Sequence, residues 1–523
     1  MNDVRGVDAG KRPMLRFWAW WVAAGVLLLV GTAILLVSTD DVQRSTDLAG
    51  ATPVRVLSPS GPVRGPALVL AHGFSGSAAM MDPMGSALTR AGFVVVAPDL
   101  PGHGRNATPL TDDSLEPAIA DAVAYAATRT GAPVAVVGHS MGAGAVTSWA
   151  LDNDPVATVA ISLPSAEDLP ADPARPRNLL ALVGSVESSR FVSAAAQALR
   201  LGHPDGQWGV TYGDAGAGTA RRAVQVAGAE HISVIYRQQT FAETAQWLAV
   251  AGDDSVLGGV GTDEPVGTAE PAPQGDVRLL GVVLVLVAGV LAARPLLAMA
   301  GRDTGTRVVG SGGSSGLSAR FRLPRTLAAF GVAAALAGLI AAALGPVTAA
   351  VPVAVTGYLL GWFAVGALAL GVLSRRRPGP FGTLPGLGWG ALAGAIVALA
   401  MALPARLSWA SYALVGPRGW VLALLVAVLG GWFWAEARLL TEAVGWRRGV
   451  ALVVSRLIVV AGLLGAVVLL GAPGFLTLTV PLVVPILLLL AVLAGWARDP
   501  AAAAAAQSVP LALAMATVFP IVG

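Results

Sequence analysis

Residues 133–142 read Pro-Val-Ala-Val-Val-Gly-His-Ser-Met-Gly, and this stretch decides the fold of its part of the chain. Its apolar start, Pro133–Val137, is typical of a buried strand, and the residues after it are compatible with a helix. Gly138 and Gly142 flank Ser140 in the pattern G-x-S-x-G, in which glycines permit a sharp turn from strand to helix. The pattern predicts that Ser140 is exposed on this turn, at the N-terminal end of the helix.

The regions on either side repeat the same alternation of strand and helix. Short apolar runs at Ala67–Ala71, Phe93–Ala97 and Leu179–Val183 are separated by helical stretches between Ala51 and about Ala251. Strands that alternate with helices favour a parallel sheet covered on both faces. The sequence therefore predicts an α/β domain at residues 40–251.

Three segments of this domain resemble the α/β-hydrolase superfamily, and within it the monoglyceride-lipase and esterase branch. They are Leu70-Ala71-His72-Gly73-Phe74, Pro98-Asp99-Leu100-Pro101-Gly102-His103-Gly104 and Gly138-His139-Ser140-Met141-Gly142. The resemblance covers residues 52–250, which is under half of the chain. It implies a mostly parallel, doubly wound sheet and a catalytic triad in the chain order serine, acid, histidine.

The resemblance then assigns the two partners of Ser140. His231 is the histidine nearest the end of the domain, and it is expected to act as the general base. Glu187 follows the strand Leu179–Val183 with the family's spacing, although aspartate is the common residue there. Asp214 and Asp205 also lie between that strand and His231, so they remain alternatives for the acid.

Two backbone N–H groups are expected to form the oxyanion hole. Met141 follows the nucleophile directly, and Phe74 lies in the loop after the strand Ala67–Ala71. Donors in these positions stabilise charge that appears only in the transition state. About 14 residues separate the strands near Val156–Leu163 and Asn178–Val183, which is too few for a helical cap domain. We therefore expect an open site without a sizeable cap.

The composition excludes several other kinds of site and partner. The chain of 523 residues has no cysteine, so thiolate nucleophiles and cysteine-based metal sites are excluded. We see no metal-ligand cluster and no phosphate-binding loop with its lysine, and we expect no cofactor and no metal. Basic residues are interleaved with long apolar runs, which argues against a nucleic-acid partner.

The other half of the chain is strongly apolar. Hydrophobic residues make up 55% of the sequence and charged residues 12%, against about 25% charged residues in soluble proteins. Apolar runs of membrane-spanning length predict about nine transmembrane helices, at 17–37, 279–298, 327–344, 348–373, 384–403, 419–435, 449–471, 476–496 and 503–522. The last of these is the weakest, because it is rich in alanine and contains two prolines.

These observations divide the chain into five parts. They are a basic cytoplasmic tail at 1–16, a transmembrane anchor at 17–37, the extracytoplasmic α/β-hydrolase domain at 40–251, a flexible acidic linker at 252–277 and an all-α polytopic transmembrane region at 278–523. Residues 40–277 carry 25 acids and 13 arginines, whereas the rest carries 6 acids and 21 basic residues.

The arginines predict how the helices cross the membrane. With a cytoplasmic N-terminus, nearly all loop arginines after Arg278 fall inside, and only Arg406 and Arg418 fall in outer loops. The domain then lies outside the cytoplasm of a cell membrane. Within the spans, Arg456 is expected to reach the interface with its long side chain, and Glu436 is expected at the surface.

The function expected from this sequence is that of a membrane-bound serine hydrolase. It would cleave a carboxylic ester, either a small molecule or a lipid-like one, through an acyl-enzyme at Ser140. Two alternatives remain: an acyltransferase that acts on a membrane-embedded acceptor, and a non-catalytic binding domain on a transporter or assembly protein. The lipid bilayer is the other expected partner.

Overall fold

The computed structural model describes residues 7–37, 42–251, 277–301, 322–375, 381–408 and 411–523, and these form two compact units. The unit that we call the sheet unit comprises Val37–Val277, Ala405–Val415 and Val518–Gly523. The helical unit comprises Met1–Leu36, Arg278–Pro404 and Gly416–Thr517. Except for Val277, the expected linker at 252–277 lies outside the described residues.

The sheet unit is built on one eight-stranded sheet with the order β1-β2-β4-β3-β5-β6-β7-β8. Its strands are β1 (Val42–Ala49), β2 (Thr52–Pro59), β3 (Ala67–Ala71), β4 (Val95–Pro98), β5 (Val134–His139), β6 (Thr158–Ile161), β7 (Leu179–Gly184) and β8 (Arg221–Val226). β2 pairs antiparallel with β1 and β4, and every other neighbouring pair is parallel. The mostly parallel sheet expected from the sequence is confirmed.

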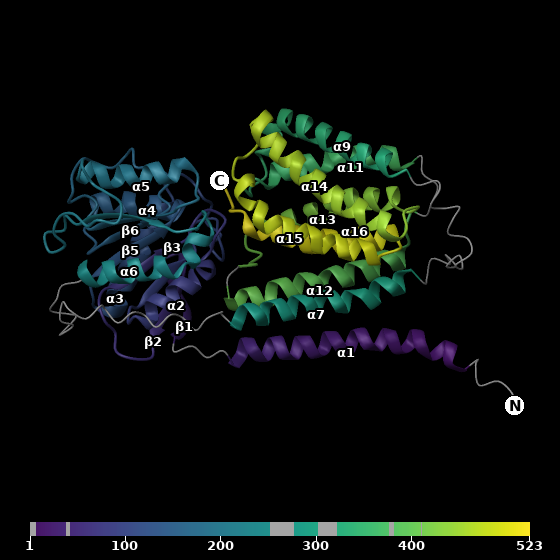
Figure 1. Ribbon diagram of the computed structural model, residues 1–523, viewed down its shortest axis with the longest axis horizontal. Coiled ribbons are helices and arrows are strands. Elements are labelled where there is room, and N and C mark those ends of the chain that lie inside the picture. The colour runs from purple at the N-terminus through teal and green to yellow at the C-terminus, as the bar shows by residue number, and fades with distance from the viewer. Residues whose placement is uncertain (1–6, 38–41, 252–276, 302–321, 376–380, 409–410) are drawn as a thin grey trace. The chain divides into compact units, whose positions relative to one another are not determined.

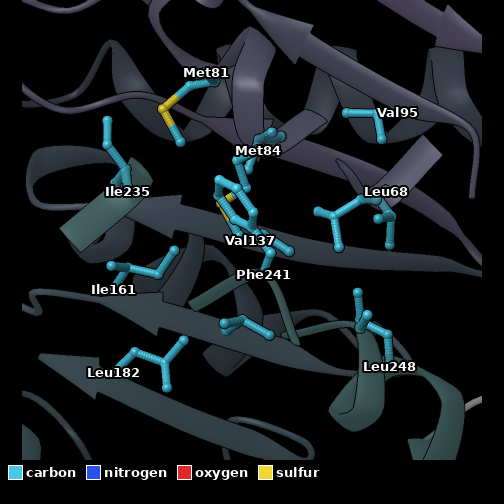
Figure 2. Close-up of a cluster of buried hydrophobic side chains, with 14 of the residues drawn as sticks. Leu68, Met81, Met84, Val95, Val137, Ile161, Leu182, Ile235, Phe241 and Leu248 are labelled. Atoms are coloured by element: carbon cyan, nitrogen blue, oxygen red, sulfur yellow. The ribbon is translucent and has the colours of Figure 1, made fainter. Parts of the chain in front are cut away.

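Helices cover both faces of this sheet (Figure 1). They are α2 (Asp82–Arg90), α3 (Leu115–Thr130), α4 (Met141–Asp152), α5 (Ser189–Gly202) and α6 (Gln238–Ala251), with short 3-10 helices η1 (Ala78–Met81) and η2 (Ser233–Tyr236). Figure 2 shows the core on the face covered by α2 and α6, where Leu68 and Val137 pack with Met84 and Phe241. The alternate residues Val69 and Val136 pack on the other face with α3 and α4.

The strands are continuous apolar runs because both faces of the sheet are buried. All five residues of β3 and all six of β5 are buried. A parallel strand between two helical layers has no solvated face, so it does not alternate between polar and apolar residues. β6 and β7 are connected without a helix through residues 162–178, and the expected absence of a sizeable cap is therefore confirmed.

The helical unit consists of long apolar helices. They are α1 (Val7–Val37), α7 (Val277–Ala300), α9 (Leu323–Ala343), α11 (Thr356–Arg375), α12 (Leu384–Ser408), α13 (Arg418–Leu439), α14 (Gly445–Leu470), α15 (Leu476–Trp496) and α16 (Pro500–Val518), with the short α10 (Gly345–Thr348). Among the described residues, eight of these helices are long and apolar enough to cross a membrane. α15 is the further apolar helix that the sequence predicts, and its described apolar stretch, Val483–Trp496, is shorter.

Several expected spans have other ends in the structure, and at two of these ends a proline explains the difference. The span expected to begin at residue 348 begins at Thr356, because the chain first makes the short α10 and a turn around Pro352. A proline disfavours helical backbone in the residue before it, so a helix seldom runs through such a site. At the other end, α16 stops at Val518, before Pro520.

The alanine-rich α16 is the most buried of the candidate spans. In its most apolar window 78% of the residues are buried, against 11% to 50% in the others. Gly390 and Gly394 of α12 allow its close approach: a Cβ on Gly394 would lie 2.8 Å from the carbonyl oxygen of Ala505, and one on Gly390 would lie 2.5 Å from the Cα of Ala502. Small residues let helix backbones approach closely in a membrane bundle.

Glu436 and Arg456 correct the sequence interpretation, which placed one at the surface and the other at the membrane interface. Both are 1% exposed, and the Arg456 guanidinium donates to both carboxyl oxygens of Glu436 at 2.6 and 2.9 Å. Arg456 also donates to Gln507 at 2.5 Å, and Ser455 donates to Glu436 at 2.6 Å. The network joins α13, α14 and α16, because a charge taken out of water requires a partner.

Candidate active site

Ser140 lies on the turn between β5 and α4. Its backbone has φ +53° and ψ −118°, a strained conformation for a residue with a side chain. The flanking glycines leave no room for side chains: a Cβ on Gly142 would lie 2.5 Å from the carbonyl oxygen of His72, and one on Gly138 would collide with the carbonyl of Gly142. The turn holds the half-buried Ser140 side chain beyond the end of β5.

The structure brings Ser140, His231 and Glu187 into one line of hydrogen bonds. The Nε2 of His231 is 3.0 Å from the Oγ of Ser140, and its Nδ1 is 2.7 Å from the Oε2 of Glu187. Carboxylate oxygens only accept, so Nδ1 carries the proton and Nε2 is left to accept from the serine hydroxyl. The side chains of His231 and Glu187 are 7% and 0% exposed.

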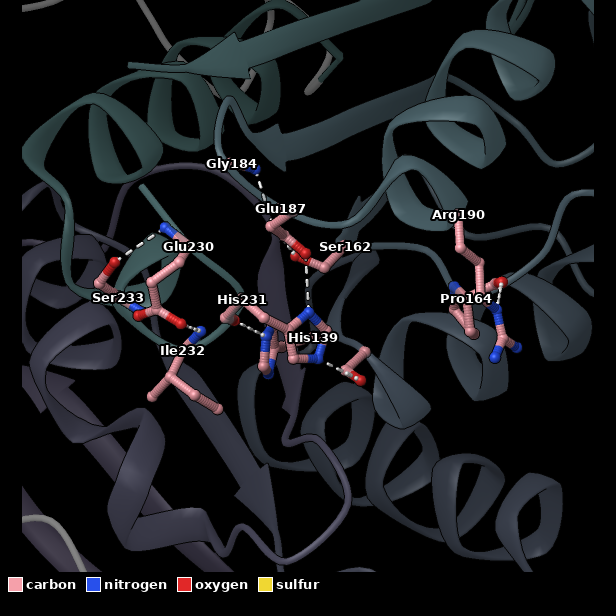
Figure 3. A network of polar contacts seen from close by, with 11 residues as sticks. His139, Ser162, Pro164, Gly184, Glu187, Arg190, Glu230, His231, Ile232 and Ser233 are labelled. Atoms are coloured by element: carbon pink, nitrogen blue, oxygen red, sulfur yellow. Dashed lines mark hydrogen bonds and ion pairs between the residues drawn. The ribbon is translucent and has the colours of Figure 1, made fainter. Parts of the chain in front are cut away.

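Glu187 is held by groups from two neighbouring strands (Figure 3). Its Oε1 accepts hydrogen bonds from the N–H of Gly184, at the end of β7, and from the hydroxyl of Ser162, just beyond β6, both at 2.7 Å. The carboxyl group therefore has a donor on each oxygen, including His231. This geometry fixes its orientation toward the imidazole and compensates for its burial.

His139 holds the backbone of His231 from inside the domain. Its Nε2–H donates to the carbonyl oxygen of His231 at 2.8 Å, and the two rings lie 5.1 Å apart. Complete burial, together with the nearby His231, lowers the pKa of His139 from 6.5 to about 3. His139 is therefore neutral at ordinary pH and does not compete for a proton. The ring of Phe191 stacks on His231 at 4.2 Å.

The loop after β3 passes close to Ser140. A Cβ on Gly73 would lie 2.8 Å from the Nδ1 of His139 and 3.1 Å from the Cβ of Ser140. Phe74 is the next residue of this loop, and Met141 is the first residue of α4, whose N–H has no acceptor in an earlier turn. The two residues expected to form the oxyanion hole are thus carried by segments that meet at Ser140.

His72 fixes the start of this loop. Its Nδ1–H donates to the carbonyl oxygen of Gly73 at 2.8 Å, and its Nε2 accepts from the N–H of Leu100 at 3.1 Å. Burial lowers the pKa of His72, which keeps the ring neutral and able to accept. His72 therefore ties the end of β3 to the residues after β4.

The alternative acids do not lie beside His231. Asp214 accepts from the N–H groups of Gly216 and Ala217 in an exposed turn, and Asp205 lies in another exposed turn. The ring of His203 stacks on Tyr212. In the part of the chain that the structure describes, no group of three or more potential metal-ligating side chains gathers.

Sequence reasoning missed the three side chains that hold the His231–Glu187 pair. Ser162 has a positive φ of 54°, and no pattern in the sequence predicts this conformation. Phe191 is one of 12 phenylalanines and carries no motif that would single it out. His139 is part of the G-x-S-x-G pattern, and its position one residue before the nucleophile is the only available signal.

We expect His139 to make the sheet unit less stable in acid. Its pKa lies near 6.5 in the unfolded chain and about 3 in the folded one, so between these values the unfolded state binds more protons. The free energy of unfolding should then fall with decreasing pH from 6.5 toward 3, with a slope from this group of at most about 1.4 kcal/mol per pH unit. The measurement is urea unfolding of the detergent-solubilised chain, followed by pulse proteolysis of the sheet unit at each urea concentration.

The matched variant is His139→Gln, which keeps an N–H donor but cannot titrate. It should reduce the slope below pH 6.5, although His72 continues to contribute in the same direction. Comparing slopes separates proton binding from any loss of packing. An unchanged slope in the variant would contradict the buried, neutral state of His139.

Comparison with known proteins agrees with the fold. Residues 66–208 match the family model for the alpha/beta hydrolase fold. No curated protein matches the chain. A protein described as a predicted CIB-like hydrolase from Thermoplasma acidophilum is 20% identical, with a TM-score of 0.32, over 40% of this chain and 98% of its own.

Two further solved structures have similar TM-scores and cover a similar share of this chain. A soluble variant of monoglyceride lipase from Saccharomyces cerevisiae is 13% identical, with a TM-score of 0.31, over 42% of this chain and 98% of its own. A serine hydrolase without lid from Xanthomonas campestris is 13% identical, with a TM-score of 0.30, over 41% and 94%. The sheet unit, which matches the family model over residues 66–208, is an α/β-hydrolase domain in a chain that also carries a region of apolar helices.

Proposed function

We propose that this chain is a serine hydrolase that cleaves a carboxylic ester. The observation that carries the proposal is the line of hydrogen bonds from Ser140 through His231 to Glu187, at 3.0 and 2.7 Å. A binding domain has no need of a strained serine, an oriented imidazole and a buried carboxyl group in one line. Serine, unlike an aspartate at this position, is suited to acyl transfer and not to epoxide or halide displacement.

The proposed reaction has two halves. In the first, the Oγ of Ser140 attacks the ester carbonyl while the Nε2 of His231 takes its proton, and the N–H groups of Phe74 and Met141 stabilise the oxyanion. The imidazolium, stabilised by Glu187, then protonates the leaving alcohol. In the second half, His231 activates a water molecule that releases the acid from Ser140 and restores the enzyme.

The absence of a helix between β6 and β7 supports an open site for the substrate. We propose a small or lipid-like ester. A helical cap that would enclose an acyl chain is missing, which favours the small ester of these two. Acyl transfer to an alcohol in the membrane would use the same acyl-enzyme. Analysis of the products with and without an added alcohol separates the two outcomes.

We also propose that the hydrolase domain lies outside the cytoplasm of a cell membrane and that nine helices cross it. The domain follows α1, Ala405–Val415 contains the last residues of α12 and those after it, and Val518–Gly523 begins at the last residue of α16. All three belong to the sheet unit. Nine crossings from a cytoplasmic N-terminus bring all three to the same side. The sequence-based division into tail, anchor, domain, linker and helical region is retained in this proposal.

Ser140→Ala should abolish labelling of the purified chain by a fluorophosphonate probe and lower esterase turnover by several orders of magnitude. The reason is that only the oxyanion hole and substrate binding remain without the nucleophile. Labelling is read by mass spectrometry of the modified peptide and turnover with a chromogenic short-chain ester. Labelling of the variant at the wild-type level would contradict the proposed function.

Glu187→Gln should lower turnover by at least about 10², since the imidazolium loses its counter-charge and the imidazole its orientation. Glu187→Asp keeps the charge but shortens the side chain by one methylene, so it should cost less. Asp214→Asn is the matched control and should be nearly silent, because Asp214 contacts only its own turn. A large loss in Asp214→Asn with none in Glu187→Gln would reassign the acid.

Single cysteines should report the orientation, because the chain has none of its own. Leu48, on β1, is 61% exposed, and Val444, between α13 and α14, is 47% exposed. In intact cells, Leu48→Cys should react with a membrane-impermeant maleimide, whereas Val444→Cys should react only after permeabilisation. The reverse pattern would invert the proposed orientation.

A further inference from the structure

The segment Phe519–Gly523, which follows α16, pairs with the loop between β4 and α3 of the hydrolase domain. The N–H of Ile521 donates to the carbonyl oxygen of Gly102 at 2.9 Å, and the carbonyl oxygen of Ile521 accepts from the N–H of Leu110 at 2.8 Å. Leu110 also forms a parallel β-bridge with Val522. Residues far apart in the chain thus share a short strand pairing, in which Ile521 is 2% exposed.

The loop between β4 and α3 approaches this segment closely at Gly102. Gly102 has a φ of +75°, which residues with a Cβ adopt only with strain. A Cβ on Gly102 would also collide with the carbonyl oxygen of Ile521. Glycine at this position therefore serves both the conformation of the loop and the close approach of the segment.

His103 connects this loop to the loop beside Ser140. Its Nδ1–H donates to the carbonyl oxygen of Pro101 at 2.8 Å, which leaves Nε2 to accept from the N–H of Ser75 at 3.1 Å. Its ring also packs edge-on against Phe74 at 5.7 Å. His103 is completely buried, so a shift of its backbone is transmitted to Phe74 and Ser75 by direct contact.

We propose that Phe519–Gly523 is a positioning element of the active site. This inference rests on the proposed function. By pairing with Gly102 and Leu110, the segment holds His103 in place, and His103 holds the backbone of residues 74–75 where an oxyanion forms. Because α16 leads directly into the segment, a rearrangement of this helix that withdraws it would weaken catalysis without touching Ser140, His231 or Glu187.

The test replaces Ile521 in the full chain with aspartate, which cannot remain buried without a partner. Ile521→Asp should lower kcat for a chromogenic ester about tenfold with KM unchanged, which is less than the 10²–10³ lost when an oxyanion donor is removed outright. Val63→Asp adds the same charge to the same domain at a position that is 54% exposed, and it should stay within about twofold of wild type. Ile521→Val keeps an apolar side chain at this buried position and should have the wild-type kcat.

Amide hydrogen exchange supplies a readout that is independent of activity. In Ile521→Asp, exchange should become faster at Leu110 and Ser75 and stay unchanged in β5 and β7. Equal kcat values for the two aspartate variants would overturn the proposal, as would faster exchange throughout the domain, which would indicate a general loss of stability.

The positioning role of Phe519–Gly523 and the proposed hydrolase activity can be tested separately. A wild-type chain that is not labelled by a fluorophosphonate removes the proposed function. The exchange at Ser75 still decides in that case whether the segment holds the loop: faster exchange in Ile521→Asp supports the positioning, and unchanged exchange overturns it.

Discussion

The candidate site depends on the parallel pairing of six neighbouring strands, in the sheet order β4-β3-β5-β6-β7-β8. It brings the carboxyl ends of six strands to one edge of the sheet, and each of them supplies part of the site. The order along that edge is the loop with His103, the loop with Gly73, then Ser140, Ser162, Glu187 and His231. Side chains from distant parts of the sequence therefore meet at this edge, where ligand-binding loops commonly lie in parallel sheets.

The residues of the hydrogen-bonded line were predictable because each follows a recognisable strand. The flanking glycines indicate Ser140, and the resemblance to α/β hydrolases, through its chain order, implies Glu187 and His231. What could not be predicted is how they are held. The bond from His139 to the backbone of His231, and the one from Ser162 to Glu187, depend on local backbone geometry that has no periodic signature in sequence.

In the helical region, hydropathy along the sequence predicts the helices but not the contacts between them. Apolar length predicts that a helix exists, and it did so for each expected span, but it does not tell which face meets a neighbour. Arg456 and Glu436 therefore received a surface interpretation, although they form a buried pair on two different helices. The span at α16 was the weakest prediction because it is rich in alanine and contains two prolines, yet its small residues allow close packing, and it is the most buried candidate span.

The pairing between Gly102 and Ile521 also bears on how the protein is made. The ribosome synthesises a chain from its N-terminus, so the strands from β1 to β8 are available long before α16 has been synthesised. Contacts between residues so distant in sequence form late, since the loop that they close is long. A newly synthesised hydrolase domain therefore passes through a stage in which its sheet is complete while the loop at Gly102 still lacks its partner. Completion of the domain is in this way tied to synthesis of the last apolar helix.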